Sequence, residues 1–217
     1  MSNKSNKYGY VGPEVTQAFK ANKGIFDIAG INNLVSENKW TNFGQLELIH
    51  TENVSAGTSL YEFTEAIGNF DTSYNVHLLT MNNWVASADN TIPTIYAYEA
   101  GVLRTGGYQI AMQGGRPNGF SEYKNSWSPN GIAHVGSGQD NASTSSSNGY
   151  VFFHNLTDST KFSFATFHWS YIYYTDVYEM NYGSGSIGGA SYVNGIRLFP
   201  NGGTFAADLS LYGIRYS

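Results

Sequence analysis

The chain has 217 residues, of which 12% are charged and 16% aromatic, and it contains no cysteine. Its net charge is −5 and its 11 basic residues are scattered, which excludes the basic surface that nucleic acid requires. Without cysteine, a disulfide framework and a thiolate metal site are excluded as well. We expect no membrane insertion and no cleaved signal, because no apolar run approaches the roughly 20 residues that span a bilayer and no leader pattern opens the chain.

Residues 1–26 are interpreted as an extended N-terminal arm. Residues 1–7 are small and polar, and residues 8–26 place isolated apolar side chains among glycines. Such a segment cannot build a core of its own, so its apolar side chains should pack against the main body or a neighbouring subunit. The candidate contact residues are Tyr8, Tyr10, Val11, Val15 and Phe19.

Residues 27–39 have the pattern of a short amphipathic helix. Asp27 is a plausible N-cap, and the apolar residues that follow recur at helical spacing. They are Ile28, Ile31, Leu34 and Val35. We expect this helix to plug the open end of a β-sandwich, which divides the chain into residues 1–40 (arm and helix) and 41–217 (sandwich domain).

From residue 41 onward the apolar period becomes two, which indicates strands. In residues 43–50, Leu46 and Leu48 form the apolar face of a half-buried strand, and Pro93 demotes the start of the strand at 92–103 to an edge. Further strand patterns cover residues 61–63, 73–80, 150–154, 161–167 and 169–174, and loops are expected at 136–149 and 183–189.

The closing residues 194–216 predict a β-hairpin around Asn201, Gly202 and Gly203. A strand pair this rich in apolar residues should complete the core. Because the strands do not alternate with helices, we predict a single all-β domain, an antiparallel jelly-roll-like β-sandwich with an N-terminal arm and one short plug helix.

Motifs that carry chemistry are sparse. The five histidines form no HxH or HExxH pair, the carboxylates are not paired, and there is no GxSxG elbow or P-loop. Asp140 and Asp158 could offer oxygen ligands to Ca²⁺, but turn chemistry explains both more simply. We expect no catalytic residue, no cofactor and no metal, although a glycosidase could still assemble two carboxylates from distant strands.

Aromatic residues exceed what one core can bury, since consecutive strand residues point to opposite faces. We expect some rings at the surface, either between the subunits of an oligomer or as a platform for a carbohydrate or receptor. The candidates for this surface are Trp84, Trp127, Trp169, Tyr171 and Tyr173, with Tyr174 and Tyr178 beside them.

Five stretches together resemble a family of structural proteins of tailed bacteriophages, especially marine and cyanobacterial phages. The first two are YGYVGPEVTQAFKANKGIFDIAGINNLVSENKW at 8–40 and FGQLELIHTENVSAGTSLYEFTEAI at 43–67. The others are YNVHLLTMNN at 74–83, GYVFFHNLTDSTKFSF at 149–164 and NGIRLFPNGGTFAADLSLYGIR at 194–215. These stretches consist of packing and turn residues and include no catalytic motif.

The resemblance implies a non-enzymatic virion protein on the particle surface, assembled in the host cytoplasm as a capsid decoration, cement or head-fibre protein. Its partners would be other virion proteins of the capsid or tail, with residues 1–26 as the particle contact, and copies of itself, with a trimer favoured. The alternative is a tail-fibre or receptor-binding appendage that recognises a host surface glycan. A carbohydrate-binding module and a glycan hydrolase are the competing classes.

Overall fold

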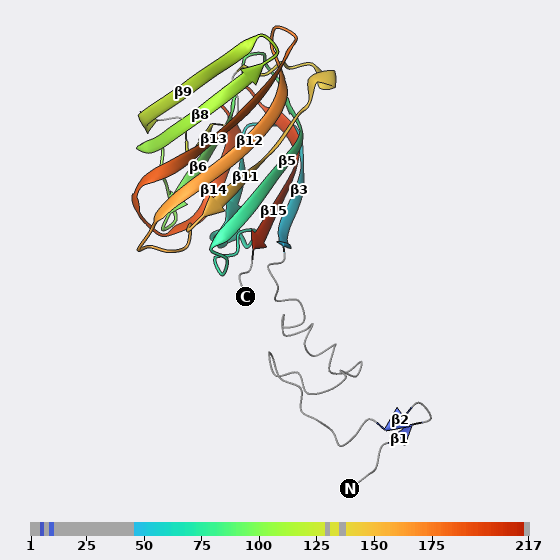
Figure 1. Cartoon of the computed structure of the whole chain (residues 1–217), viewed down its shortest axis with the longest axis vertical. Helices are drawn as coiled ribbons and strands as arrows, with labels where there is room; N and C mark the ends of the chain where they lie inside the picture. Colours follow the sequence, from blue (N-terminus) through green and yellow to red (C-terminus); the bar gives the residue numbers. More distant parts are fainter. Residues whose placement is uncertain (1–4, 7–8, 11–45, 129–130, 135–137, 215–217) are drawn as a thin grey trace. The chain divides into compact units, whose positions relative to one another are not determined.

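The computed structural model describes residues 5–6, 9–10, 46–128, 131–134 and 138–214 (Figure 1). The chain divides into two units, one of which is Leu46–Arg215 and the other Met1–Gln45 with Tyr216–Ser217. In the latter, β1 (Ser5–Asn6) pairs with β2 (Gly9–Tyr10) in antiparallel fashion. The predicted helix at 27–39 lies outside the described residues.

The larger unit is an all-β antiparallel sandwich, which confirms the predicted fold class at this level (Figure 1). Its eight-stranded sheet has the order β3-β15-β5-β11-β12-β13-β8-β9. These strands are β3 (Leu46–Thr58), β15 (Phe205–Ile214), β5 (Val76–Ala86), β11 (Ser147–His154), β12 (Phe162–Tyr173), β13 (Val177–Ala190), β8 (Tyr108–Arg116) and β9 (Gly119–Ser128).

The smaller sheet has the order β10-β6-β14-β4, with a short strand β7 paired to β6. Its strands are β10 (Ala133–His134), β6 (Pro93–Glu99), β14 (Val193–Pro200), β4 (Tyr61–Thr64) and β7 (Val102–Leu103). The helices in the described part are two 3₁₀ turns, Glu65–Ile67 and Ser143–Ser145.

The core lies between the two sheets and follows from alternation along the strands. In β15, Phe205, Ala207, Leu209 and Leu211 are buried and the residues between them are half-buried. Trp84 stacks on Phe205 with ring centroids 4.1 Å apart. Side chains of the smaller sheet, such as Ile95, Ile196 and Leu198, are fully buried in the same cluster.

The closing segment does not form the hairpin that its sequence predicts. β14 pairs with β4 and β6 in the smaller sheet, whereas β15 pairs with β3 and β5 in the larger one. The turn between them therefore crosses from one sheet to the other. The expectation that this segment completes the core is confirmed, because each of its strands lies between two neighbours of its own sheet.

Three local expectations are also wrong. The glycines at 183–189 belong to β13, where the lack of a Cβ lets neighbouring backbone approach closely: a Cβ on Gly185 would lie 1.9 Å from the carbonyl oxygen of Ile132. Pro93 begins a strand that lies between β10 and β14, not at an edge. Leu46 and Leu48 are 50% and 58% exposed. A bulge at Ile49 reverses the alternation of the strand, so Leu46 and Leu48 point outward although His50 and Glu52, at the same spacing, point inward.

Candidate interaction surface

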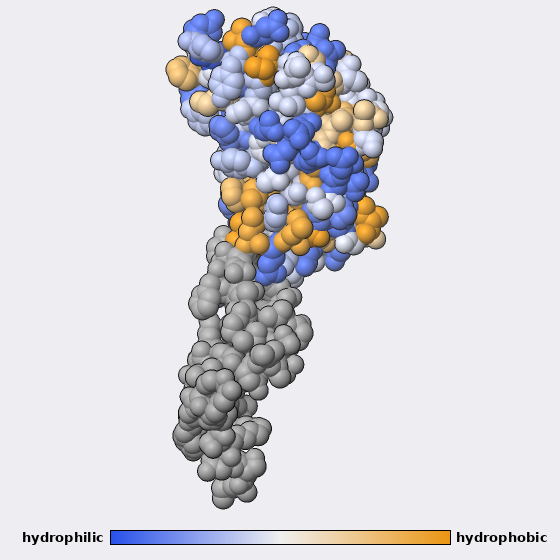
Figure 2. All heavy atoms as spheres, turned by 90° about the vertical axis from the view of Figure 1, so that its right-hand side faces the viewer, coloured by the Kyte–Doolittle hydropathy of each residue, from blue (hydrophilic) through white to orange (hydrophobic). Residues whose placement is uncertain are grey.

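The outer face of the larger sheet carries an apolar band two residues wide. The register places one residue of each of five adjacent strands side by side in each row. The first row is Leu46, Ile214, Val76, His154 and Phe164, and the second is Leu48, Tyr212, Leu78, Phe152 and Thr166. Figure 2 shows hydrophobic residues gathered on the lower part of the folded body, where β3 begins.

Rings on β11 and β12 extend this band toward the middle of the sheet. Tyr150, which is 42% exposed, meets Phe152 edge-on at a centroid distance of 5.7 Å and stacks with His168 at 5.9 Å. Phe152 in turn stacks with His154 at 6.4 Å. Burial lowers the pKa of His154, which keeps this ring neutral near pH 7. The four rings, Tyr150, Phe152, His154 and His168, form one continuous aromatic surface.

Beside the band, two adjoining depressions cross β13, β8 and β9 on the outer face. The first, of about 650 Å³, has a floor of small residues and is bounded by Phe164 and Lys124. The second, of about 340 Å³, shares Ala111 and Lys124 with the first and is bounded by Tyr182, Gln113 and Glu122. We refer to the two together as the outer groove.

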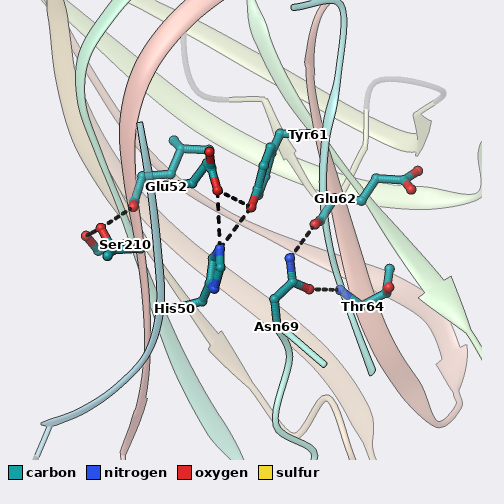
Figure 3. A network of polar contacts seen from close by, with 9 residues as sticks. His50, Glu52, Tyr61, Glu62, Thr64, Asn69 and Ser210 are labelled. Atoms are coloured by element: carbon teal, nitrogen blue, oxygen red, sulfur yellow. Dashed lines mark hydrogen bonds and ion pairs between the residues drawn. The ribbon is translucent and has the colours of Figure 1, made fainter. Parts of the chain in front are cut away.

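A polar network ties the edge strands of the two sheets together on the side of the sandwich (Figure 3). The hydroxyl of Tyr61 on β4 donates to Oε2 of Glu52 at 3.1 Å and lies 3.0 Å from Nε2 of His50, both on β3. Partial burial, followed by the hydrogen bond to Glu52, raises the pKa of Tyr61. Asn69 accepts from the Thr64 amide and donates to the Glu62 carbonyl. The arrangement fixes the spacing of β3 and β4.

The inner face of β13 holds a charged group that the sequence did not single out. Glu179 is fully buried and its Oε2 accepts from Nε of Arg116 at 2.6 Å. The guanidinium of Arg116 also lies 3.9 Å from the ring centroid of Tyr173. Pairing across adjacent strands satisfies the carboxylate where it lies, so we interpret this pair as structural.

Three of the predicted surface aromatic residues lie in the core, and this part of the prediction is wrong. Trp84, Trp169 and Tyr171 have exposed fractions of 1%, 0% and 2%. They occupy inward positions of β5 and β12, so neither a subunit interface nor a sugar can reach them.

The remaining predicted residues have varied positions. Tyr173 is half-buried under Arg116. Trp127 belongs to β9, but its side chain lies outside the described part. Tyr10 belongs to β2, and Tyr8, Val11, Val15 and Phe19 lie outside the described residues.

Surplus rings do reach the surface, as expected, but at other positions. Tyr174 and Tyr178 are 41% and 48% exposed. Within the part of the chain that the structure describes, the other exposed Phe and Tyr rings are Phe120, Tyr150, Phe162, Phe164 and Tyr182. Alternation along β12 is the signal that could have identified the exposed rings on this strand. Phe162 and Phe164 have even residue numbers and Trp169 has an odd one, so they point to opposite faces of the sheet.

Asp158 and Asp140 serve turns, as predicted. Oδ1 of Asp158 accepts from the amide and hydroxyl of Thr160, and Asp140 accepts from the amide of Ala142. Within the described residues, no group of three or more histidines and carboxylates is arranged to hold a metal ion. No helix in the same part of the chain is long and apolar enough to cross a bilayer.

Comparison of the chain with protein-family models, with curated proteins and with solved structures gives no match.

Proposed function

We propose that this chain is a non-enzymatic structural protein displayed on the surface of a tailed-bacteriophage particle, as a capsid decoration, cement or head-fibre protein. It assembles with copies of itself through the apolar band, with a trimer as the favoured state, and with other virion proteins of the capsid or tail. The single observation that carries the proposal is the apolar band on the outer face of the larger sheet.

The band supports assembly because the outer face of an antiparallel sheet is ordinarily polar. Here two adjacent rows on five strands are almost wholly apolar, and Leu46, Leu48 and Phe164 expose between 43% and 58% of their surface. A contiguous apolar patch of this kind marks an interaction site in a soluble protein. The aromatic rings beside it are the residue type that interfaces favour.

The order of the strands supports a jelly-roll lineage. Eight strands, namely β3, β4, β5, β6, β10, β11, β14 and β15, form a set in which each sheet receives four. Numbered from one to eight in chain order, they lie 1-8-3-6 in the larger sheet and 2-7-4-5 in the smaller, which is the order of a jelly roll. Two further strand pairs, β12-β13 and β8-β9, extend the larger sheet. Viral capsid domains commonly use this architecture.

The molar mass in solution tests the assembly. We expect light scattering after size exclusion to give about three times the 23.8 kDa of the chain. Leu48→Asp places a charge at the β3 end of the band, at a 58% exposed position, so the fold should persist while the assembly dissociates.

Val102→Asp is the matched control, since Val102 is 70% exposed and lies on β7 of the other sheet. A monomeric wild-type protein would contradict the proposal. A Leu48→Asp variant that assembles like the wild type would contradict the role of the band.

A further inference from the structure

We propose that the outer groove binds an uncharged linear glycan. This inference rests on different residues from the assembly through the apolar band, apart from Phe164, which borders both, and it does not depend on that assembly. The alternative function of a glycan-recognising appendage would then reside in this groove and not in the buried tryptophans.

The floor of the groove is open because its residues are small. Ser186, Ser184 and Ala111 face outward from β13 and β8, with Ser184 and Ala111 directly opposite each other in the register. Phe164 and Lys124 border the first depression, and Tyr182 and Glu122 border the second, so the groove exists because small residues lie between larger ones on this face of the sheet. Its two parts, of about 650 and 340 Å³, lie in the range of about 300–1,000 Å³ that ligand sites occupy.

Aromatic walls provide the apolar half of sugar recognition. Phe164 borders the first depression with 43% of its surface exposed, and Tyr182 borders the second with 42% exposed. A pyranose ring has an apolar face of C–H groups, which packs on the face of an aromatic ring. Two such rings, on β12 and β13, give successive sugars a surface to pack on.

Amides and hydroxyls provide the polar half. The Tyr182 hydroxyl donates to Oε1 of Gln113, and the hydroxyl of Ser186 lies 3.5 Å from Oε1 of Gln109. Because the Gln113 amide uses its oxygen in this way, its NH₂ group remains oriented as a donor for sugar hydroxyls. An amide held in this way needs little ordering when a ligand binds.

Charge selects the class of glycan. The residues that line the two depressions include one cation, Lys124, and one anion, Glu122, two residues apart on β9. Their charges cancel, and the whole chain has a net charge of −5. This pattern matches an uncharged polymer, and it disfavours sulfated or phosphorylated polymers, which require a cluster of cations.

The experiment is native affinity electrophoresis in gels that contain hydroxyethylcellulose, laminarin, dextran or galactomannan, with dextran sulfate as an anionic comparison. We expect at least one neutral polymer to retard the wild-type protein. Tyr182→Ala should weaken that binding roughly five- to tenfold through loss of the stacked ring. Ala111→Trp should abolish it by filling the floor.

Phe162→Ala is the matched control, because Phe162 is 51% exposed on the same face of β12 as Phe164 but does not line the groove. It should bind like the wild type, and so should Leu48→Asp, which separates this test from that of the assembly. The proposal is overturned if no neutral polymer retards the protein, if only dextran sulfate does, or if Tyr182→Ala and Ala111→Trp bind as well as the wild type.

Discussion

Replacing Trp169 by alanine tests whether this side chain packs in the core or serves as an exposed surface residue. The side chain of Trp169 is fully buried on the inner face of β12, and its ring meets that of Trp84 edge-on at 6.4 Å. Its neighbour across the strand pair is Gly149, where a Cβ would lie 2.1 Å from the indole. Gly149 has no side chain that could fill the space left by truncation of this ring.

The expected cost follows from the buried area. An aromatic side chain of this size buries about 150–250 Å², which corresponds to about 4–6 kcal/mol at roughly 25 cal/mol per Å². Truncations of buried Phe and Trp to alanine cost about 3–5 kcal/mol. We therefore expect Trp169→Ala to lower the free energy of unfolding by about 4 kcal/mol and, with a urea m-value of about 2 kcal/mol/M, to lower the midpoint by about 2 M.

Phe162→Ala is again the control, since it removes a 51% exposed ring from the other face of the same strand. Its effect should stay within about 0.5 kcal/mol. The reasoning is refuted if Trp169→Ala changes the urea midpoint no more than Phe162→Ala does.

Three further perturbations test separate parts of the fold. His77 is fully buried and bonds the Asp71 carbonyl through Nε2, and burial lowers its pKa, so stability should fall as pH drops below about 6.5, where the unfolded chain gains the proton. Because burial lowers the pKa of His154 as well, His77→Gln should reduce but not abolish the fall of the urea midpoint between pH 7 and 5, and an unchanged slope would contradict this. The Lys161 ammonium and the Thr160 donors hold the pKa of Asp158 at about 2, so the contribution of this carboxylate to stability should be present above about pH 4 and lost as pH falls through 2. Asp158→Asn should remove this pH dependence when the stability of the protein is measured across the acid range. A Cβ on Gly213 would lie 2.3 Å from the ring of Tyr74, so Gly213→Ala should lower the free energy of unfolding, measured by thermal unfolding, by about 1–3 kcal/mol. Gly202 has open space around it, so Gly202→Ala should be close to neutral, and equal effects of the two variants would refute the packing argument.

Alternation along strands is sufficient to predict the all-β class of the fold. In residues 161–174, every second residue from Ala165 to Tyr173 is apolar, which is typical of a strand, and β12 (Phe162–Tyr173) covers nearly the same range. Strand pairing is different, because the turn at 201–203 is compatible with a hairpin and with a crossing between sheets. The long-range pairing of β15 with β3 and β5 determines that the turn crosses between the sheets, and the local sequence does not contain that information.

The sequence predicts that aromatic rings are exposed, but it does not predict which ones. Abundant aromatic residues indicate that some rings must be exposed, but which strand face is inward depends on the partner sheet. Trp169 and Phe164 on β12 illustrate this, since both are large apolar residues and only their parity separates the core from the surface. The bulge at Ile49 similarly reverses the expected burial of Leu48, and no local motif marks it.

The ion pair between half-buried Arg116 and fully buried Glu179 shows a further limit. The two residues are distant in sequence and become neighbours only because β8 pairs with β13 in the register that opposes Gly115 and Met180. Glycines 183 and 185 were interpreted as loop residues because their composition is typical of loops. In the sheet they permit close strand contact, a role that becomes visible only when the neighbouring strands are known.

The proposal that this chain is a phage surface protein is tested most directly by a cryo-EM reconstruction, at side-chain resolution, of the particle that it is proposed to decorate. The account predicts density for the sandwich on the outside of the particle, with Leu48, Leu78 and Phe152 buried against a neighbouring copy and the groove around Ser184 facing solvent. A particle without such density, or one in which the apolar band faces solvent in every copy, would contradict it.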